Sequence, residues 1–589
     1  MDFLRTLGGW LRTLLAVIGG LLVLGIVALI AFGLTNRGAK IADQSILVMD
    51  LKGELPEYAA SDFTTNLLGN ATLTFKDQLD NLKKAAKDNR IKGVLVKLDS
   101  LGAGWAQVQE LRDAFAEFHK SGKFAIGYSE AINERGYYLA LALDNYYMPP
   151  TGFFEMNGLT TEITHWPGLL QKLGVGVQYF RYGKYKSQSG ESLGRIALSE
   201  PVKEMINLNL DEEYSVFVKA VADGKKLSVE QVKQLIDSNL PNAEWALEHK
   251  LIDGIAYADE VESIIKKRIG VDADKNLEKV KASDYGQVAL EDMGLNKGSN
   301  KVGIVYSVGL IVAGEGGGAS PLSSGPSQGA EPIIRALQEA GKRDDIKAVV
   351  FRVDSPGGAG LGCDLVRRAV EQLAKKKPVI VSMGNYAASG GYWVSMDGTA
   401  IVADPLTLTG SIGIWSVIPN VEALNKNLAL NVESFKRGNR ADALSGNHPL
   451  NPENAKIFDQ ELLKSYQRFV QLAAQGRHKP LAAMQEIAQG RTWLGAHAQT
   501  LGLVDKLGGF DTAIALAAEK IKVTPNDISL EVLQKQESSL GTLLGQSATE
   551  LILRAFGIER TAQKFKTPLS LDLLLEHHTF PLMEPVKVD

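Results

Sequence analysis

The chain has 589 residues, of which 45% are hydrophobic and 22% charged, an ordinary globular composition with room for two or more domains. Its net charge is −4, with acidic and basic residues interspersed, which argues against a nucleic-acid-binding protein, since such a protein needs a concentrated basic face. The single cysteine, Cys363, excludes an internal disulfide and a cysteine-based metal site. We expect neither a metal nor a cofactor.

The first forty residues contain a long uncharged segment. Leu14–Leu34 has no charged residue across 21 positions, and a helix of that length spans about 30 Å, the hydrocarbon thickness of a bilayer. A secretory signal peptide has a shorter apolar core, of about 7 to 15 residues. We therefore expect residues 1–40 to be a retained membrane anchor. Basic residues flank both ends of the segment and leave its orientation open.

The rest of the chain is duplicated. Asp88–Gly102 reads DNRIKGVLVKLDSLG and Arg343–Gly357 reads RDDIKAVVFRVDSPG, with six of fifteen positions identical at an offset of 255 (343 − 88). The same offset carries the GYY of residues 136–138 onto the GYW of residues 391–393. An ungapped register of this length indicates two related halves.

Each half alternates β-forming runs with helical segments, as in Gly93–Leu98 before Gln107–Phe118 and Ala348–Val353 before Cys363–Leu373. Strands separated by ten to fifteen helical residues are typical of βαβ units, so we predict an α/β fold with two tandem domains and mostly parallel sheets. The expected units are the anchor at 1–40, a first repeat at 41–270, a linker at 271–301, a second repeat at 302–523 and a helical tail at 524–589.

One segment near the start of the second half is rich in Gly, Ser and Pro, namely Val312–Ala330. Two interpretations stay open for it, a surface loop and a flap beside an active site.

A serine in the second half is the candidate nucleophile. An apolar run ends in AASGG at residues 387–391, a pattern that indicates a strand, a sharp turn and a helix start. The small neighbours of Ser389 would let a substrate backbone approach its hydroxyl, as a nucleophile requires. A serine that only caps a helix fits the same residues, so the evidence has to come from elsewhere in the chain.

A nucleophilic serine needs a base. None of the eight histidines lies at a strand end or in a Gly-rich turn beside an acidic residue, so a lysine whose pKa is lowered by burial is favoured. The offset of 255 places Glu134 opposite Ser389. It also places Ala441 opposite Lys186, so each half keeps one member of a possible pair. A composite site with Ser389 from the second half and Lys186 from the first explains this divergence. A solvated Lys186, with Lys184 as the base, is the alternative.

A third motif, DSPGG at residues 354–358, follows a predicted strand. Its two glycines could turn backbone N–H groups toward a ligand and form an oxyanion hole. The counterpart, DSLGA at residues 99–103, has lost the proline and one glycine. A plain tight turn is the alternative.

Together these motifs resemble the signal peptide peptidase A family, in its long duplicated form, within the Clp-protease and crotonase fold superfamily. The matching motifs are DSPGG at 354–358, SMGNYAASGGYW at 382–393, TGSIG at 409–413, YKS at 185–187 and GRTW at 490–493. The resemblance implies Ser389 as nucleophile and Lys186 as general base, with Ser411 orienting the lysine amine. It also implies an oxyanion hole made by the N–H of Ser389 and by Gly357 or Gly358.

The resemblance further implies a homotetramer on the bacterial cytoplasmic membrane, with a single membrane span and the catalytic body on the periplasmic side. Its substrates would be released signal peptides and other apolar segments that arrive from the lipid bilayer. Gln188–Glu191 departs from the apolar run usual in the family, which affects the expected substrate pocket more than the lysine.

Three functions are therefore compared. A serine endopeptidase with a Ser/Lys dyad accounts for all the motifs. A crotonase-like acyl-CoA enzyme would use the Gly-rich turns to stabilise an enolate, but it explains neither the anchor nor the Ser389/Lys186 pair. A catalytically inactive membrane scaffold would explain the degraded first half but not the intact motifs of the second.

Overall fold

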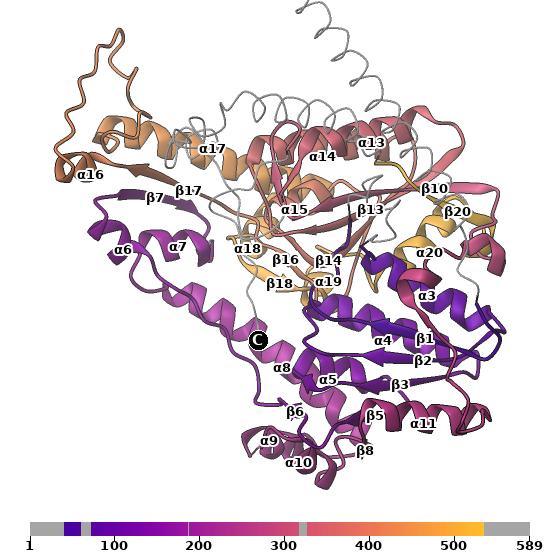
Figure 1. Ribbon diagram of the computed structural model, residues 1–589. Coiled ribbons are helices and arrows are strands. Elements are labelled where there is room, and N and C mark those ends of the chain that lie inside the picture. Colours follow the sequence, from indigo (N-terminus) through magenta and orange to yellow (C-terminus); the bar gives the residue numbers. More distant parts are fainter. Residues whose placement is uncertain (1–40, 60–71, 187, 239, 317–326, 535–589) are drawn as a thin grey trace, which may run out of the picture.

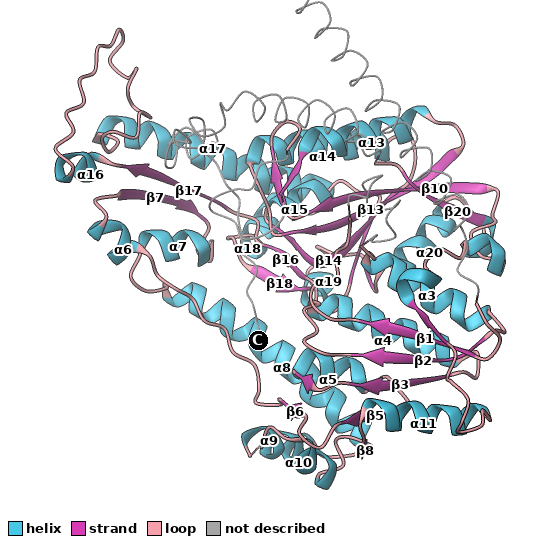
Figure 2. Cartoon of the chain, viewed as in Figure 1, coloured by secondary structure: helices cyan, strands magenta, loops and turns pink. Residues whose placement is uncertain are grey.

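The computed structural model describes residues 41–59, 72–186, 188–238, 240–316 and 327–534, without the side chains of residues 188 and 189. It contains two mostly parallel sheets, one in each half, flanked by helices (Figures 1 and 2). The predicted α/β fold with tandem repeats is confirmed. The predicted anchor at residues 1–40 lies outside the described residues, and no helix within them is long and apolar enough to cross a membrane.

The two sheets have the same strand order. From edge to edge, the first contains β8 (Gly254–Ile255), β5 (Asn145–Met148), β3 (Phe124–Tyr128), β2 (Ile91–Lys97), β1 (Ser45–Asp50) and β9 (Lys279–Lys281). The corresponding strands of the second are β19 (Lys506–Leu507), β15 (Ala400–Ala403), β14 (Val379–Ala388), β13 (Ile346–Ser355), β10 (Asn300–Val308) and β20 (Ile528–Val532). The neighbours in both series are parallel. β16 (Leu408–Gly410) pairs with the end of β14, and β18 (Thr492–Leu494) runs antiparallel to β16.

The helices repeat as well. In the first half they are α3 (Phe75–Lys87), α4 (Trp105–His119), α5 (Glu134–Ala140), α8 (Glu200–Lys225), α9 (Val229–Asp237), α10 (Ala243–Glu248) and α11 (Ala258–Ile269). Their counterparts are α13 (Ala330–Lys342), α14 (Gly360–Ala374), α15 (Gly390–Ser395), α17 (Pro452–Gly476), α18 (Leu481–Ile487), α19 (Gly495–Thr500) and α20 (Phe510–Lys520). α3 and α13 begin 255 residues apart (330 − 75), as do α4 and α14 (360 − 105). The duplication therefore extends to the secondary structure.

The two repeats share one core. Phe75 of α3 and Val350 of β13 belong to the same buried cluster. Within this core Arg352 of β13 is fully buried, with its Nε 2.9 Å from Glu57 Oε2 and its Nη2 2.8 Å from Glu110 Oε1. Both carboxylates come from the first half. Removing one partner of a buried ion pair is strongly destabilising, so this contact ties the halves together.

A two-stranded antiparallel ribbon also joins the halves. β7 (Gly176–Tyr182) pairs with β17 (Ile414–Asn420), from Tyr182 opposite Ile414 to Gly176 opposite Asn420. α6 (Pro167–Lys172) and α7 (Gln188–Gly194) flank β7, and α16 (Glu422–Asn427) follows β17 (Figure 1). Because β7 pairs with a strand of the second repeat, the residues that follow it, including Lys186, lie against the second repeat.

Short pairings complete the fold. β4 (Ala131–Ile132) pairs with β6 (Phe153–Phe154), and β11 (Leu310–Val312) pairs with β12 (Ser327–Gly329). β11 and β12 are the ends of the Gly-rich segment, whose residues 317–326 lie outside the described residues. Both interpretations of that segment therefore stay predictions.

Two expectations about connecting segments need correction. The predicted linker at 271–301 holds α12 (Ala282–Tyr285), η1 (Leu290–Met293) and the edge strand β9, which pairs with β1. The predicted helical tail begins with η2 (Pro525–Asp527) and with β20, which pairs with β10. β9 has only three residues, KVK, and leaves no pattern, whereas β20, ISLEV, alternates apolar and polar residues but lies beyond the point where the sequence repeat ends. The other predicted domain limits stay predictions.

Candidate functional site

The serine corner is a sharp turn between a strand and a helix. β14 ends at Ala388, Ser389 has φ 55° and ψ −113°, and α15 begins at Gly390. A non-glycine residue with positive φ is strained and is often found at functional sites. The two glycines that follow are required by close packing. A Cβ at Gly390 would lie 2.8 Å from Gly358 N, and one at Gly391 would lie 2.4 Å from Ser355 O.

Lys186 reaches this corner from the first repeat. Its Nζ lies 2.7 Å from Ser389 Oγ and 2.9 Å from both the carbonyl oxygen and Oγ of Ser411. The side chain is fully buried. Burial lowers the pKa of Lys186 well below its ordinary value of 10.5, while the nearby Cys363 thiol acts more weakly in the opposite direction. The sequence-predicted pair Ser389 and Lys186 is thus brought together, with Ser411 beside it.

Tight backbone contacts deliver the lysine. After β7 the chain turns at Gly183, which has φ 115°, and Tyr185 N donates to Gln489 O at 2.8 Å. Gly490 also has positive φ, 74°, and a Cβ there would lie 2.4 Å from Lys186 Cβ. Glycine is therefore needed at position 490 for both its conformation and its close approach to the lysine.

Ser411 is held from the opposite side. It too has positive φ, 53°, and its N–H donates to Arg491 O at 2.7 Å. The Arg491 guanidinium lies over the rings of Tyr185 and Trp493, at 4.8 and 4.5 Å from their centroids. The segment GRTW thus packs against Lys186 through Gly490 and binds Ser411 through Arg491, whereas its sequence motif indicated the family and not this role.

One of the donors expected for the oxyanion hole, the N–H of Ser389, is already used in a backbone hydrogen bond. The N–H of Ser389 donates to Gly410 O at 2.8 Å, because β14 and β16 pair up to this point. The N–H of Gly357 donates to Ser355 Oγ at 3.2 Å. Within the described part of the chain, the N–H groups of Gly358 and Gly390 have no hydrogen-bond partner. These two amides, rather than that of Ser389, are the unbonded backbone donors beside the serine in the described residues.

The aspartate of the DSPGG motif is structural. Asp354 Oδ1 accepts from Tyr386 N at 2.8 Å, and burial raises the pKa of this carboxyl to about 7. Its counterpart Asp99 accepts from Ala131 N, the counterpart of Tyr386 N, at 3.3 Å and from Glu130 N at 2.6 Å. Since the first half keeps this contact without a serine, the aspartate serves the turn and not the chemistry.

The equivalent corner of the first repeat is closed by a carboxylate. Glu134 is buried, and its Oε1 accepts from Asn157 N at 2.7 Å and from Gly158 N at 3.0 Å. Burial raises the pKa of this carboxyl. The first repeat therefore has, in place of the serine, a buried carboxylate that is held by two backbone amides.

The remaining candidates are placed elsewhere. Lys184, the alternative base, is exposed and lies over the Tyr185 ring. No described histidine has a hydrogen bond to Ser389. Glu191, in the segment that departs from the family pattern, is fully buried, pairs with Arg181 and accepts from Ser199 N at 2.7 Å. An acidic residue in a polar stretch gave no signal of this burial.

Comparisons with known proteins agree with the repeat. The model of peptidase family S49 matches twice, at residues 117–272 and 371–524. The chain is 36% identical to the chloroplastic serine protease SPPA of Arabidopsis thaliana over 90% of this chain and 76% of that protein. It is 30% identical to protease 4 of Salmonella typhi over 83% of this chain and 79% of that protein. Neither the acyl-CoA enzyme nor the inactive scaffold gains support.

Among solved structures, a ClpP1 mutant from Listeria monocytogenes is 13% identical, covering 36% of this chain and 93% of that chain with a TM-score of 0.24. This score carries no argument, so the Clp-protease and crotonase superfamily stays a prediction.

Proposed function

The chain belongs to peptidase family S49 and is a serine peptidase, and we propose that Ser389 is its nucleophile and Lys186 its general base. The observation that carries this assignment is the 2.7 Å contact between Lys186 Nζ and Ser389 Oγ, inside a site that disfavours the charged ammonium. A neutral amine has two N–H groups and one lone pair. The two N–H groups are used by the Ser411 carbonyl and Oγ, which leaves the lone pair for the Ser389 hydroxyl proton.

The geometry supports the following reaction. Lys186 takes the proton as Ser389 Oγ attacks the peptide carbonyl, and the N–H groups of Gly358 and Gly390 hold the resulting oxyanion. The lysine then gives its proton to the leaving amine, and an acyl-enzyme forms. Water, deprotonated by the same lysine, attacks the acyl carbon, and the lysine returns the proton to Ser389 Oγ as the bond to the serine breaks and the peptide acid leaves. A positioned base contributes about 10²- to 10⁴-fold and one oxyanion donor about 10²- to 10³-fold.

Labelling with a fluorophosphonate, which reacts with activated serines, tests the dyad. Ser389→Ala should abolish labelling, and Lys186→Met should slow it by about 10²- to 10⁴-fold at neutral pH. Matched controls are Ser307→Ala, which removes another buried hydroxyl, and the exposed Lys184→Met; both should label at the wild-type rate. Labelling that persists in Ser389→Ala would contradict the nucleophile, and an unchanged rate in Lys186→Met would contradict the base.

The substrate class follows from the family resemblance. We propose that the enzyme degrades released signal peptides and other apolar segments, and that the uncharged residues 14–34 anchor it in the bacterial cytoplasmic membrane with the catalytic body on the periplasmic side. Incubation of vesicles bearing the full chain with a synthetic signal peptide tests this. Cleavage of a soluble polar peptide at an equal or higher rate would contradict the substrate class, and release of the chain by alkaline carbonate would contradict the anchor.

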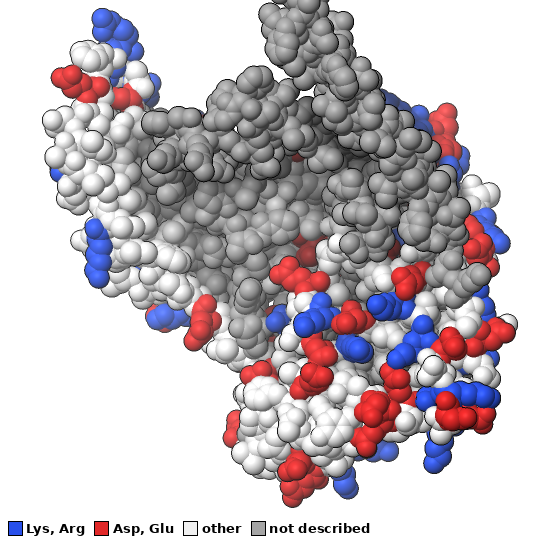
Figure 3. All heavy atoms as spheres, in the orientation of Figure 1, with Lys and Arg blue, Asp and Glu red and all other residues white. Residues whose placement is uncertain are grey.

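We also propose that the chain assembles as a homotetramer. An exposed apolar flank supports self-association: Trp166, Leu169 and Leu173, on and beside α6, are 44%, 47% and 51% exposed, and large apolar patches on soluble surfaces mark interaction sites. In Figure 3 the side chains over α6, β7 and β17 are mostly uncharged, while acidic and basic side chains alternate over the first repeat. Light scattering of the full chain in detergent gives its mass directly, and a monomer would contradict the proposal.

A further inference from the structure

An arm projects from the second repeat. It follows α16, extends away from the body of the molecule (Figure 1), and every residue from 431 to 440 is exposed. Phe435 is 90% exposed, which is unusual for a large apolar side chain. Within the described residues, the N–H groups of residues 431–437 have no hydrogen-bond partner.

The duplication gives this arm a counterpart with a known partner. Shifting residues 431–437, NVESFKR, by 255 lands on β7, GVQYFRY. Both segments have valine and phenylalanine at the same positions, a basic residue after the phenylalanine and a glycine after the last residue. In the first repeat this segment is a strand paired with β17. The arm therefore has a sequence like that of β7 but, within the described residues, no strand paired with it.

The missing partner can be found by the same shift. The counterpart of β17 is residues 159–165, LTTEITH (414 − 255 = 159). These residues have no regular secondary structure, and their side chains alternate between half-buried and exposed, the period of a strand with one covered face. Within the described residues, the backbone of residues 159–164 makes no hydrogen bond. The segment is thus a free edge that can accept a strand.

We propose that residues 431–437 of one copy of the chain pair antiparallel with residues 159–165 of a second copy, in the register of β7 and β17. This interface rests on the self-association proposed above and gives it a defined geometry. The mode is strand addition, in which backbone hydrogen bonds supply the affinity and side-chain pockets the register.

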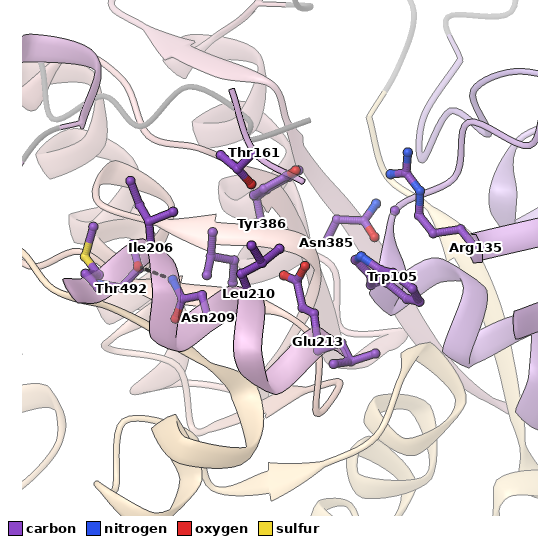
Figure 4. Close-up of a pocket in the computed structure, with 14 residues that line it drawn as sticks. Trp105, Arg135, Thr161, Ile206, Asn209, Leu210, Glu213, Asn385, Tyr386 and Thr492 are labelled. Carbon is purple, nitrogen blue, oxygen red and sulfur yellow. Dashed lines mark hydrogen bonds between the residues drawn. The ribbon is translucent and has the colours of Figure 1, made fainter. Parts of the chain in front are cut away.

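The side chains fit this register. Ser416 lies opposite Phe180 in the ribbon, so Thr161 would lie opposite Phe435. The Phe180 ring packs against Phe458, at 5.1 Å between centroids. Phe458 is the seventh residue of α17, as Ile206 is of α8. Thr161 and Ile206 line one cavity of about 50 Å³ at the surface of α8 (Figure 4), which the ring of Phe435 would enter.

Neighbouring positions agree with the pairing. Leu159 and Ile163 would flank Phe435 on one face, and on the other face Glu162 would lie diagonal to Lys436. Apolar side chains, and side chains of opposite charge, stabilise a sheet when they lie directly or diagonally across from each other on neighbouring strands. The two segments belong to different surfaces of the chain, so the contact is head-to-tail and propagates from copy to copy until the assembly closes.

Cysteine cross-linking tests the register in the full chain. Thr161→Cys and Phe435→Cys in one chain place two thiols opposite each other between copies, and oxidised glutathione accepts the two electrons when the disulfide forms. Since the only native cysteine, Cys363, is buried, the background is low. We expect cross-linked multimers on a non-reducing gel. The matched control pairs Thr161→Cys with Ser434→Cys, whose side chain points to the other face, and should cross-link at least tenfold more slowly.

The outcomes separate this interface from the other proposals. A monomeric wild type would overturn both the self-association and the interface. An assembled protein in which the Thr161/Phe435 pair does not cross-link faster than the control would overturn the interface alone. Phe435→Asp should dissociate the assembly while Ser389 still reacts with the fluorophosphonate, because the dyad lies within one chain. An assembly that survives Phe435→Asp would also contradict the interface.

Discussion

The two repeats have the same sheet order and matching helices, yet they differ completely at one corner. In the second repeat Ser389 faces a buried lysine, whereas in the first Glu134 binds two backbone amides. The turn aspartates Asp354 and Asp99 make the same contact in both. The contact that builds the corner is therefore kept in both halves, whereas the two members of the proposed dyad are divided between them.

Breaking the contact between the repeats should have the largest effect. Arg352→Met leaves Glu57 and Glu110 buried without their partner, and we expect a loss of about 3–5 kcal/mol in the free energy of unfolding by urea. The control is Arg468→Met, which removes an exposed pair with Asp364 and should cost about 1 kcal/mol or less. Equal losses in the two variants would show that the buried cluster does not hold the halves together.

Displacing the lysine should come next. In Gly490→Ala the new Cβ would overlap Lys186, and we expect kcat to fall about a hundredfold, as when a catalytic group moves by an ångström. Gly294→Ala has the same type of backbone strain, with φ 69°, but an open environment. It should lose some stability and keep its activity. A normal kcat in Gly490→Ala would indicate that the position of Lys186 can shift without loss of activity.

A change of one pH unit should alter the activity less than the Gly490→Ala substitution does. In the proposed mechanism only the neutral amine of Lys186 acts as a base, so kcat/KM should rise about tenfold per pH unit below the lowered pKa of Lys186 and become constant above it. The residual activity of Lys186→Met should lack this inflection. A midpoint near 10.5 for the wild type would argue against a buried neutral lysine.

Restoring a serine to the first repeat should have the smallest effect. Glu134→Ser, made in a Ser389→Ala background, should give no fluorophosphonate labelling, because Ala441 stands where the lysine would be needed. Adding Ala441→Lys supplies that amine from the arm of a neighbouring copy, and weak labelling is then expected. Labelling of Glu134→Ser without the added lysine would contradict the division of roles between the repeats.

Much of this arrangement could be predicted because the duplication acts as an internal comparison. The serine corner, the lysine and the mostly parallel α/β architecture follow from two aligned halves and ordinary strand and helix patterns, whereas the order of the strands within each sheet does not. The engaged N–H of Ser389 could not be predicted, since it depends on how far β14 and β16 stay paired. The burial of Arg352 and Glu191 was also hidden, because a charged residue in a sequence does not reveal its partner. The edge strand β9 has only three residues and leaves no pattern, and β20 alternates apolar and polar residues but lies beyond the end of the recognised duplication.

The ribbon of β7 and β17 has a consequence for the newly made chain. Synthesis runs from the first repeat to the second, so Lys186 leaves the ribosome about two hundred residues before Ser389, and β7 waits as an unpaired strand until β17 emerges. Gly490, which packs against the lysine, is made later still. Since Lys186 meets Ser389 and Gly490 only once the second repeat has folded, the site can assemble only after most of the chain has been translated.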